Sequence, residues 1–289
     1  MVQFPCPICG RQEHTELYPD TLGDQLPQFG YDFTPDHMRT YRVVFCRNCR
    51  HGFSSPRPAQ LWQQYEKVED LAYLHRQKER IISAQRVIRR ILRYRSSGRL
   101  LDIGCATGDF LSVARERLQV EGMELSGWAA EIARGRGLTV HRSDLARFKP
   151  VQPFDILTLW GVIEHFEHPT EEVRRMHRLL RRGGLVCLWT GDIVSWLARL
   201  LEKRWWYIQG QHLQFFSRAS LEALFVQAGF QKVWIGRYPH VTTLGSIAKS
   251  LKRYSPLGTI AERLLSLPVL SGRLVTLALP GEMFAIFRK

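Results

Sequence analysis

The stretch from Leu100 to Gly108, LLDIGCATG, decides the fold. Its apolar first half, which contains Asp102, is typical of a buried parallel strand, and Gly104 and Gly108 permit a tight turn that brings the backbone close to a ligand. The following segment, 109–118, carries apolar residues at near-helical spacing. A strand, a glycine turn and a helix in this order predict an α/β fold with a nucleotide at the end of the strand.

The spacing of the glycines argues against a dinucleotide cofactor. The motif G-x-G-x-x-G of NAD- and FAD-binding folds would require glycines at positions 106 and 109, where the chain has Ala106 and Asp109. A methyl group at Ala106 is tolerable if its φ is negative, so this departure does not imply loss of cofactor binding. The turn is therefore predicted to bind a different nucleotide.

Two further apolar stretches carry polar residues at their ends. The stretch 120–125 carries Glu124, at a point where a carboxylate can accept two hydrogen bonds from the hydroxyls of a ribose. The stretch 138–141 precedes Ser143 and Asp144. Each carboxylate taken alone could also cap a helix or end a strand, so the interpretation depends on the order of all the segments.

Four blocks in one order resemble the class I S-adenosylmethionine (SAM) dependent methyltransferases, including those of ubiquinone biosynthesis. The blocks are LLDIGCATG from 100, GMELS from 122, SDL from 143 and FDILTLWGVIEHFEHPTEEVRRMHRLLRRGGLVCL from 154. The resemblance covers about residues 95–289 and implies an α/β, Rossmann-like sheet of seven strands, with the last strand antiparallel between the fifth and sixth. The chain departs from the family pattern at Ala106, often a glycine, and at Arg182, commonly a proline.

The resemblance also implies which residues bind SAM. Asp102 and the turn after it would surround the methionine part, Glu124 would bind the ribose, and Asp144 would lie near the adenine amine. Trp160 and Gly161 would line the pocket beside the sulfonium. The complete predicted set is Asp102, Gly104, Cys105, Ala106, Gly108, Glu124, Leu125, Ser143, Asp144, Leu145, Trp160 and Gly161.

Four cysteines near the start of the chain, Cys6, Cys9, Cys46 and Cys49, form two C-x-x-C pairs. Each pair can place two thiolates on one metal ion from a tight knuckle, and two knuckles complete a tetrahedral zinc site. Four protein ligands leave no open position for a substrate. We therefore predict a structural zinc ion in a small N-terminal module.

A redox motif and disulfide bonds are the alternatives to a zinc site for these cysteines. A thioredoxin-like redox motif would need one pair at the start of a helix, whereas Gly10 and Gly52 follow the two pairs as at knuckle turns. Disulfides are not expected, because no secretory signal precedes the pairs. The two isolated thiols, Cys105 and Cys187, lie in apolar context and are expected to be inert.

The chain divides into three predicted parts. Residues 1–58 form the zinc-binding module, which resembles the module ahead of some methyltransferases of sugar and natural-product pathways. Residues 59–95 form a helical connector that precedes the first strand and covers the cofactor pocket, and residues 96–289 form the methyltransferase domain. Within that domain, 242–279 is a predicted helical insertion before the last strand. This insertion could be a lid, helices packed on the body, or a surface that contacts a membrane.

The charge composition indicates which classes of binding partner the protein can have. The chain has 289 residues, 45% of them hydrophobic, and a formal net charge of +14. This charge favours an acidic partner, such as an anionic small molecule, RNA or an anionic membrane surface. An arginine-rich coding bias is the alternative explanation. The acidic segment 13–36 would repel phosphate, which disfavours RNA. Without a predicted membrane span, we expect a cytoplasmic protein, with peripheral membrane contact as an alternative.

Methyl transfer requires a base only if the acceptor must lose a proton. His212 is the first candidate for this base, and Tyr207 is a second polar group on the substrate side. His165 follows the fourth strand of the sheet and could act there or simply hold a backbone hydrogen bond. The predicted function is methyl transfer from SAM to a small molecule, such as a sugar or natural-product intermediate. The alternatives are an RNA methyltransferase and a non-catalytic binding module.

Overall fold

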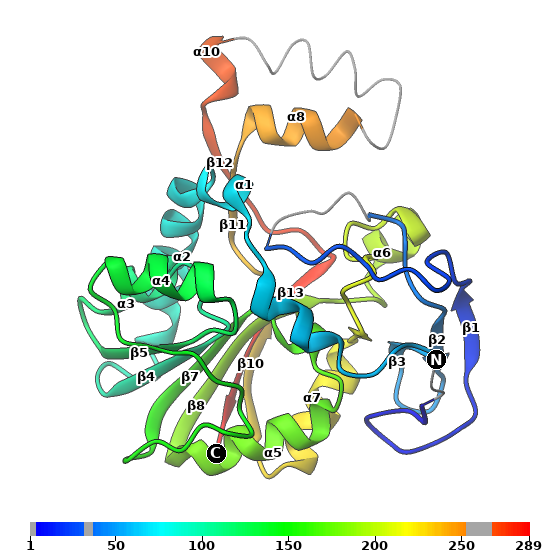
Figure 1. Ribbon diagram of the computed structural model, residues 1–289, viewed down its shortest axis with the longest axis horizontal. Helices are drawn as coiled ribbons and strands as arrows, with labels where there is room; N and C mark the ends of the chain where they lie inside the picture. Colours follow the sequence, from blue (N-terminus) through cyan, green and yellow to red (C-terminus); the bar gives the residue numbers. More distant parts are fainter. Residues whose placement is uncertain (1–3, 32–36, 253–267) are drawn as a thin grey trace.

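The computed structural model describes residues 4–31, 37–252 and 268–289. Its centre is a seven-stranded sheet (Figure 1). The strands, in spatial order, are β10 (Gln231–Gly236), β13 (Glu282–Arg288), β8 (Leu180–Gly191), β7 (Phe154–Trp160), β4 (Arg99–Ile103), β5 (Gln119–Met123) and β6 (Val140–His141). Strands β4 to β8 are parallel, and β13 runs antiparallel to both β8 and β10. The predicted α/β, Rossmann-like fold class is confirmed.

Helices cover both faces of this sheet (Figure 1). On one face lie α2 (Gln77–Ile91), α3 (Asp109–Ala114) and α4 (Gly127–Gly135), and on the other lie α5 (Pro169–Leu179) and α7 (Arg218–Gln227). Alternate strand residues point to opposite faces, so Leu100 packs with the first group and Leu101 with the second. Burial on both sides explains the near-continuous apolar runs that the strands show in the sequence.

The N-terminal residues form a second sheet that includes a strand from the catalytic part of the chain. Strands β1 (Thr15–Tyr18), β2 (Val43–Cys46) and β3 (His51–Ser54) are antiparallel. Strand β9 (Gln214–Phe215), from the segment after β8, pairs with β3 and completes the sheet. The N-terminal module therefore supports the backbone that carries His212.

Short helices connect the two sheets. The connector contains η1 (Leu61–Lys67), α1 (Leu71–Leu74) and α2, as the predicted helical region suggested. The loop after β7 contains η2 (Ile163–His165), and the segment after β8 contains α6 (Trp196–Leu201) and η3 (Glu202–Arg204).

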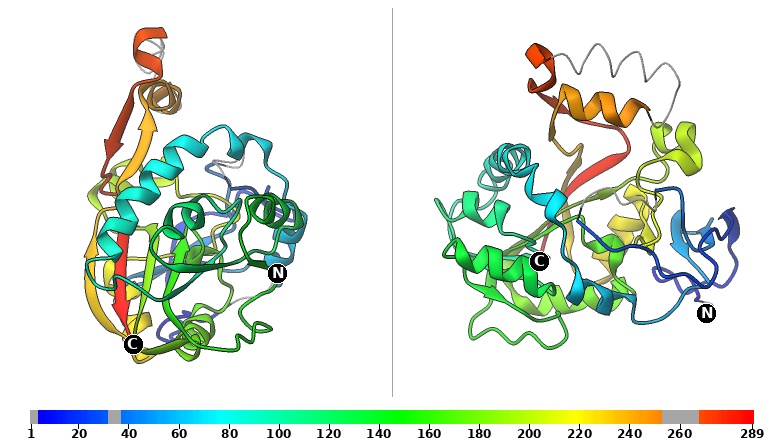
Figure 2. Two further views of the ribbon diagram at one scale, coloured as in Figure 1. Left: turned by 90° about the vertical axis from the view of Figure 1, so that its left-hand side faces the viewer. Right: turned by 45° about the horizontal axis from the view of Figure 1, so that its top comes forward.

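The region predicted as a helical insertion also contains strands. Helices α8 (Leu244–Lys252) and α10 (Pro268–Ser271) occur as expected, but β11 (His240–Thr243) and β12 (Leu274–Leu277) form an antiparallel pair at its base. Valine and threonine in both strands favour extended backbone, a signal that was missed beside the leucines. The described elements project from the body as an arm (Figure 2). Residues 253–267 lie outside the described residues.

None of the helices in the described ranges has both the length and the apolar character needed to cross a membrane.

Candidate functional site

The turn after β4 holds three residues with positive φ: Gly104 at 70°, Ala106 at 46° and Gly108 at 81°. A Cβ at Gly104 would lie 2.6 Å from Val162 Cγ2, so glycine is required there for space as well as for conformation. The φ of Ala106 is positive, so its methyl group is not in the negative-φ conformation in which it would be tolerated without strain. Its N–H donates to Glu124 Oε2 at 2.8 Å, and this bond holds the residue in the left-handed region despite its methyl group.

Glu124 is the acceptor that organises this turn. Its carboxylate is 4% exposed and also accepts the N–H groups of Leu125 at 2.8 Å and Ser126 at 2.9 Å, both on Oε1. Burial raises the pKa of Glu124, and these backbone donors act in the opposite direction by stabilising the anion. The acid therefore fixes the backbone of both neighbouring loops.

Asp102 lies at the buried end of β4, beside the turn. Thr158 Oγ1 on the adjacent strand donates to Asp102 Oδ1 at 2.6 Å. Burial raises the pKa of Asp102 to about 8, although the Thr158 hydrogen bond lowers it. A buried carboxyl of this kind would gain most from a cation beside it.

Three buried polar atoms around the turn have no hydrogen-bond partner among the described residues: Thr107 Oγ1, Trp160 Nε1 and Tyr31 Oη. The ring of Trp160, at the end of β7, lies 4.9 Å from the ring of Phe110, which follows the turn. Native proteins rarely leave such atoms unpaired, so this edge of the sheet has the polar groups that a ligand would satisfy.

The remaining predicted cofactor residues have structural roles in the described fold. Asp144 Oδ1 accepts the N–H of Arg147 at 2.8 Å and so caps a turn, while Ser143 Oγ donates to the carbonyl of Asp144 at 3.0 Å. Leu145 is buried in the core. Gly161 has a φ of 70°, and its N–H donates to the carbonyl of Trp189 at 3.2 Å.

The predicted catalytic residues form one buried network with Glu164. Tyr207 Oη donates to Glu164 Oε1, and Thr190 Oγ1 donates to Glu164 Oε2 at 3.1 Å. The rings of His165 and His212 are 4.8 Å apart. The structure therefore brings the three predicted side chains together, and Glu164 at their centre was noted in the sequence only as the neighbour of His165.

Both histidines use Nδ1 for structural hydrogen bonds. His212 Nδ1 lies 2.7 Å from the carbonyl of Tyr207, and His165 Nδ1 lies 2.9 Å from the carbonyl of Gln211 and from Tyr65 Oη. Burial lowers the pKa of His165 to about 4 and that of His212 well below its usual value, so both rings are neutral at pH 7. With Nδ1–H donating to a carbonyl, Nε2 of His212 is the nitrogen that can accept a proton.

Sequence reasoning missed a second buried acid, Glu282, at the start of β13. Its two oxygens accept the indole N–H groups of Trp206 at 2.9 Å and Trp189 at 3.0 Å. Burial raises the pKa of Glu282 to about 7. The ring of Tyr238 stacks on Trp189 with centroids 4.9 Å apart. This acid at the first residue of β13 gave no signal in the sequence, because its partners come from distant segments.

The four N-terminal cysteines lie together at the tips of two turns. The Sγ atoms of Cys6 and Cys49 are 3.4 Å apart, those of Cys9 and Cys46 are 3.6 Å apart, and all four lie within 4.8 Å of one another. These separations are too long for disulfides and approach the edge of about 3.8 Å of a tetrahedron with zinc–sulfur bonds of about 2.3 Å. The hydrogen bond from Cys49 lowers the pKa of Cys6 to about 4.

The backbone around these cysteines has the knuckle form in both pairs. The N–H of Gly10 donates to the carbonyl of Cys6, and the N–H of Arg50 donates to the carbonyl of Cys46, each at 2.8 Å. Arg50, with a φ of 61°, takes the position that the sequence had suggested for Gly52, which instead pairs within the sheet.

Comparisons with known proteins agree with this geometry. A family model described as a methyltransferase domain matches residues 73–234, more than half of the chain. The ubiquinone biosynthesis O-methyltransferase of Vibrio cholerae is 31% identical over 97 residues, 30% of this chain and 40% of that protein. The chloroplastic 2-methyl-6-phytyl-1,4-hydroquinone methyltransferase 2 of Oryza sativa is 25% identical over 167 residues, 54% of this chain and 48% of that protein. The chain thus spans less than half the length of these two relatives.

Solved structures support the fold. A SAM-dependent methyltransferase from Archaeoglobus fulgidus has a TM-score of 0.53 at 19% identity, covering 76% of this chain and 100% of that chain. A SAM-dependent methyltransferase from Thermotoga maritima, described as a possible histamine N-methyltransferase, has a TM-score of 0.50 at 22% identity, covering 75% of this chain and 92% of that chain. Because the family model covers most of the sheet and its site-bearing turns, the chain belongs to the class I SAM-dependent methyltransferases.

Proposed function

We propose that this protein transfers the methyl group of SAM to a small molecule bound beside the cofactor. The observation that carries this proposal is the burial of the acceptor-side groups: Glu164 is 1% exposed, Tyr207 3% and His212 6%. Groups buried to this degree favour a small acceptor over an RNA or protein chain. A sugar, a natural-product intermediate or a hydroxylated aromatic ring is small enough.

The residues around the glycine turn fit SAM. When bound, SAM supplies the activated methyl group, and the protein aligns the acceptor with it and excludes water. Asp102, with its raised pKa, would meet the positively charged methionine end, and Glu124 would meet the ribose. Asp144 remains the proposed neighbour of the adenine amine, and Trp160 and Gly161 remain the proposed lining beside the sulfonium.

The Glu164 network is proposed to handle the acceptor proton. His212 is held by its Nδ1 bond and presents a neutral Nε2, so it can take a proton from an acceptor hydroxyl. Tyr207 would keep Glu164 in place through their hydrogen bond. His165 is fixed between Tyr65 and the backbone of Gln211, and we assign it a positioning role.

The cysteine cluster is proposed to hold a structural zinc ion. All four ligands come from the protein, so this metal would take no part in methyl transfer. Its position suggests a supporting role, because β3 follows the second cysteine pair and pairs with β9 beside His212.

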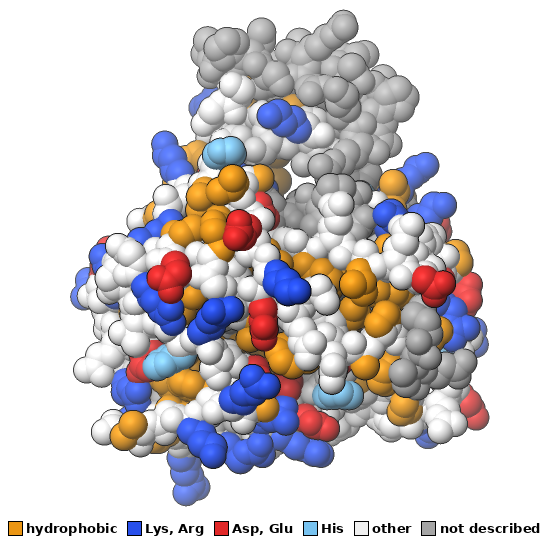
Figure 3. Space-filling view, in the orientation of Figure 1, with side chains coloured by type: hydrophobic (Ala, Val, Ile, Leu, Met, Phe, Trp, Pro, Cys, Tyr) orange, Lys and Arg blue, Asp and Glu red, His pale blue; other side chains and the backbone are white. Residues whose placement is uncertain are grey.

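The distribution of charge gives no comparable support to a nucleic-acid substrate. On the face shown in Figure 3, lysines and arginines are spread over many elements and acidic side chains lie between them. Several arginines are also neutralised by ion pairs, such as those of Arg80 and Arg136 with Asp109 and that of Arg99 with Glu121. The net charge therefore does not form a single phosphate-binding track on this face.

The proposal is tested with labelled SAM and three classes of acceptor: nucleotide sugars, hydroxylated aromatic compounds and RNA. Transfer to a small molecule is expected, and transfer to RNA alone would refute the proposal. With an active acceptor, His212→Ala is expected to reduce kcat about 100-fold or more while the Kd for SAM stays unchanged. Full turnover by this variant would exclude His212 as the base. Because Ala removes the ring, His212→Gln serves as a second variant that keeps a polar group.

A further inference from the structure

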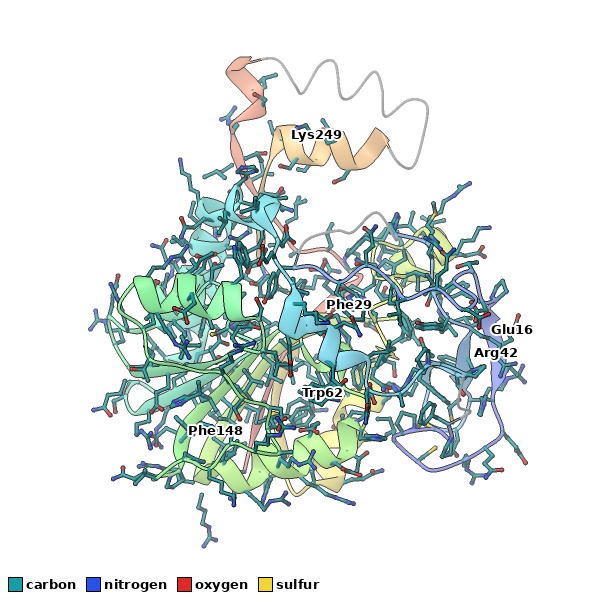
Figure 4. All side chains as sticks on the ribbon, viewed as in Figure 1. Glu16, Phe29, Arg42, Trp62, Phe148 and Lys249 are labelled. Atoms are coloured by element: carbon teal, nitrogen blue, oxygen red, sulfur yellow. The ribbon has the colours of Figure 1, made fainter. Side chains whose placement is uncertain are left out.

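Residues Phe29–Tyr31 leave the N-terminal module and lie against the methyltransferase part of the chain. The ring of Phe29 packs edge-on against Tyr65 of η1, with centroids 5.0 Å apart. In Figure 4, Phe29 accordingly lies beside η1, far from Glu16 and Arg42 at the outer side of the module. The backbone N–H of Tyr31 donates to Asp70 Oδ2, the N-cap residue of α1, at 3.0 Å.

The same short segment also contacts the acceptor loop. The N–H of Gly30 donates to Gln211 Oε1 at 3.2 Å, and this oxygen also accepts the hydroxyl of Tyr65. The segment is thus held at three successive residues by the connector and by the loop that carries His212. Such a set of anchors fixes the direction of the Tyr31 side chain.

The side chain of Tyr31 points to the cofactor edge of the sheet. Its ring lies 5.1 Å from that of Tyr73 and stacks at 6.4 Å on that of Trp128 in α4. The negative charge of Glu124 and burial both raise the pKa of Tyr31, so its hydroxyl stays protonated beside this acid and Ser126. Yet Oη has no hydrogen bond of ordinary geometry to any residue in the described part of the chain.

The acceptor positions of Glu124 suggest a ligand-binding role for the Tyr31 hydroxyl. A carboxylate offers about four lone-pair positions. Three are taken: the N–H groups of Leu125 and Ser126 use Oε1, and that of Ala106 uses Oε2. One position on Oε2 remains, beside the Tyr31 hydroxyl.

We propose that Tyr31 is a cofactor-binding residue supplied by the N-terminal region, and that its hydroxyl bonds the second ribose hydroxyl of SAM while Glu124 bonds the first. This inference rests on the placement of SAM at the Glu124 edge. It makes the N-terminal region part of the cofactor site rather than a separate appendage. It also links cofactor binding to the acceptor loop, since Gln211 holds the same segment.

The test is calorimetric titration of the full-length, metal-loaded protein with S-adenosylhomocysteine. Tyr31→Phe removes one hydroxyl and is expected to raise Kd about three- to ten-fold, the value of one ordinary hydrogen bond. Tyr41→Phe is the matched control, because Tyr41 is a buried tyrosine of the same region whose hydroxyl contacts the carbonyl of Gln25. Its Kd is expected to equal that of the wild type.

An analogue of S-adenosylhomocysteine that lacks both ribose hydroxyls isolates the contact. With this ligand, the wild type and Tyr31→Phe are expected to bind equally. Asp70→Ala, which removes the acceptor of the Tyr31 N–H and the N-cap of α1, is expected to weaken binding of the natural ligand as well. A wild type that binds S-adenosylhomocysteine while Tyr31→Phe and Asp70→Ala bind it equally well would overturn the role of Tyr31. A folded wild type with no binding at all would instead overturn the cofactor assignment on which the proposed function depends.

Discussion

The affinity for SAM should depend on pH through Asp102. Burial raises the pKa of this carboxyl to about 8, and the proposed neighbour is the positively charged methionine end of SAM. Because the cation favours the ionised carboxylate, SAM must bind the deprotonated form, and protonation competes with binding. The affinity for SAM therefore rises as the pH rises toward the pKa of Asp102, and it levels off above that pKa.

The size of the effect follows from the fraction of ionised Asp102. With a pKa of about 8, about 1% of the carboxyl is ionised at pH 6 and about half at pH 8, so the Kd for SAM should fall about 50-fold over this range. The residual affinity of the neutral form limits this span. An ionic hydrogen bond of about 1.5–3 kcal/mol corresponds to roughly 10- to 150-fold, which is consistent with the same range.

Calorimetric titrations between pH 6 and pH 8 measure this dependence. Asp102→Asn keeps the shape of the side chain and an acceptor for Thr158 Oγ1, and its Kd should be independent of pH and close to the weak value at pH 6. In buffers with different ionisation enthalpies, the wild type should release about 0.9 proton per SAM bound at pH 7. A wild-type Kd that stays constant from pH 6 to pH 8 would refute the placement of the methionine ammonium beside Asp102.

Two further predictions concern stability. Cys46→Ser should reduce the zinc content from about one ion per chain to less than half, and a loss of about 3 kcal/mol would lower Tm by roughly 5 °C. An unchanged Tm with equal zinc content would exclude a structural role. Ala106→Gly should leave the free energy of unfolding within about 1 kcal/mol of the wild type, because relief at a φ of 46° offsets the added entropy of the unfolded chain. The control is Ala219→Gly, at an exposed position in α7 with ordinary helical backbone. Its free energy of unfolding, measured with denaturant, should fall by about 0.5–1 kcal/mol. Equal losses in both variants would contradict the strain at Ala106.

Short-range sequence patterns predicted the elements whose conformation depends on residues close together in the chain. The apolar strand at Leu100 and Leu101, the glycine turn after it and the helix that begins beyond Gly108 all follow from side-chain spacing and backbone freedom. The order of the seven strands required the family resemblance. The positive φ of Ala106 could not be predicted because the N–H of this residue is bound by Glu124, a residue 18 positions away. A hydrogen bond between residues this far apart in the sequence cannot be predicted from the side-chain types alone.

The contacts that complete the site could not be read from the sequence, because each joins segments far apart in the chain. Strand β9 pairs with β3, and the backbone of Tyr31 is held by Asp70. Nothing in the residues around position 31 marks a cofactor contact, since a tyrosine in a glycine- and proline-rich segment is compatible with an exposed loop. The Tyr31 hydroxyl makes the connection: it is unpaired by geometry among the described residues, it lies beside the acid proposed to bind the ribose, and it comes from the N-terminal region. A metal site that stabilises this region would then act on cofactor affinity as well as on the acceptor loop.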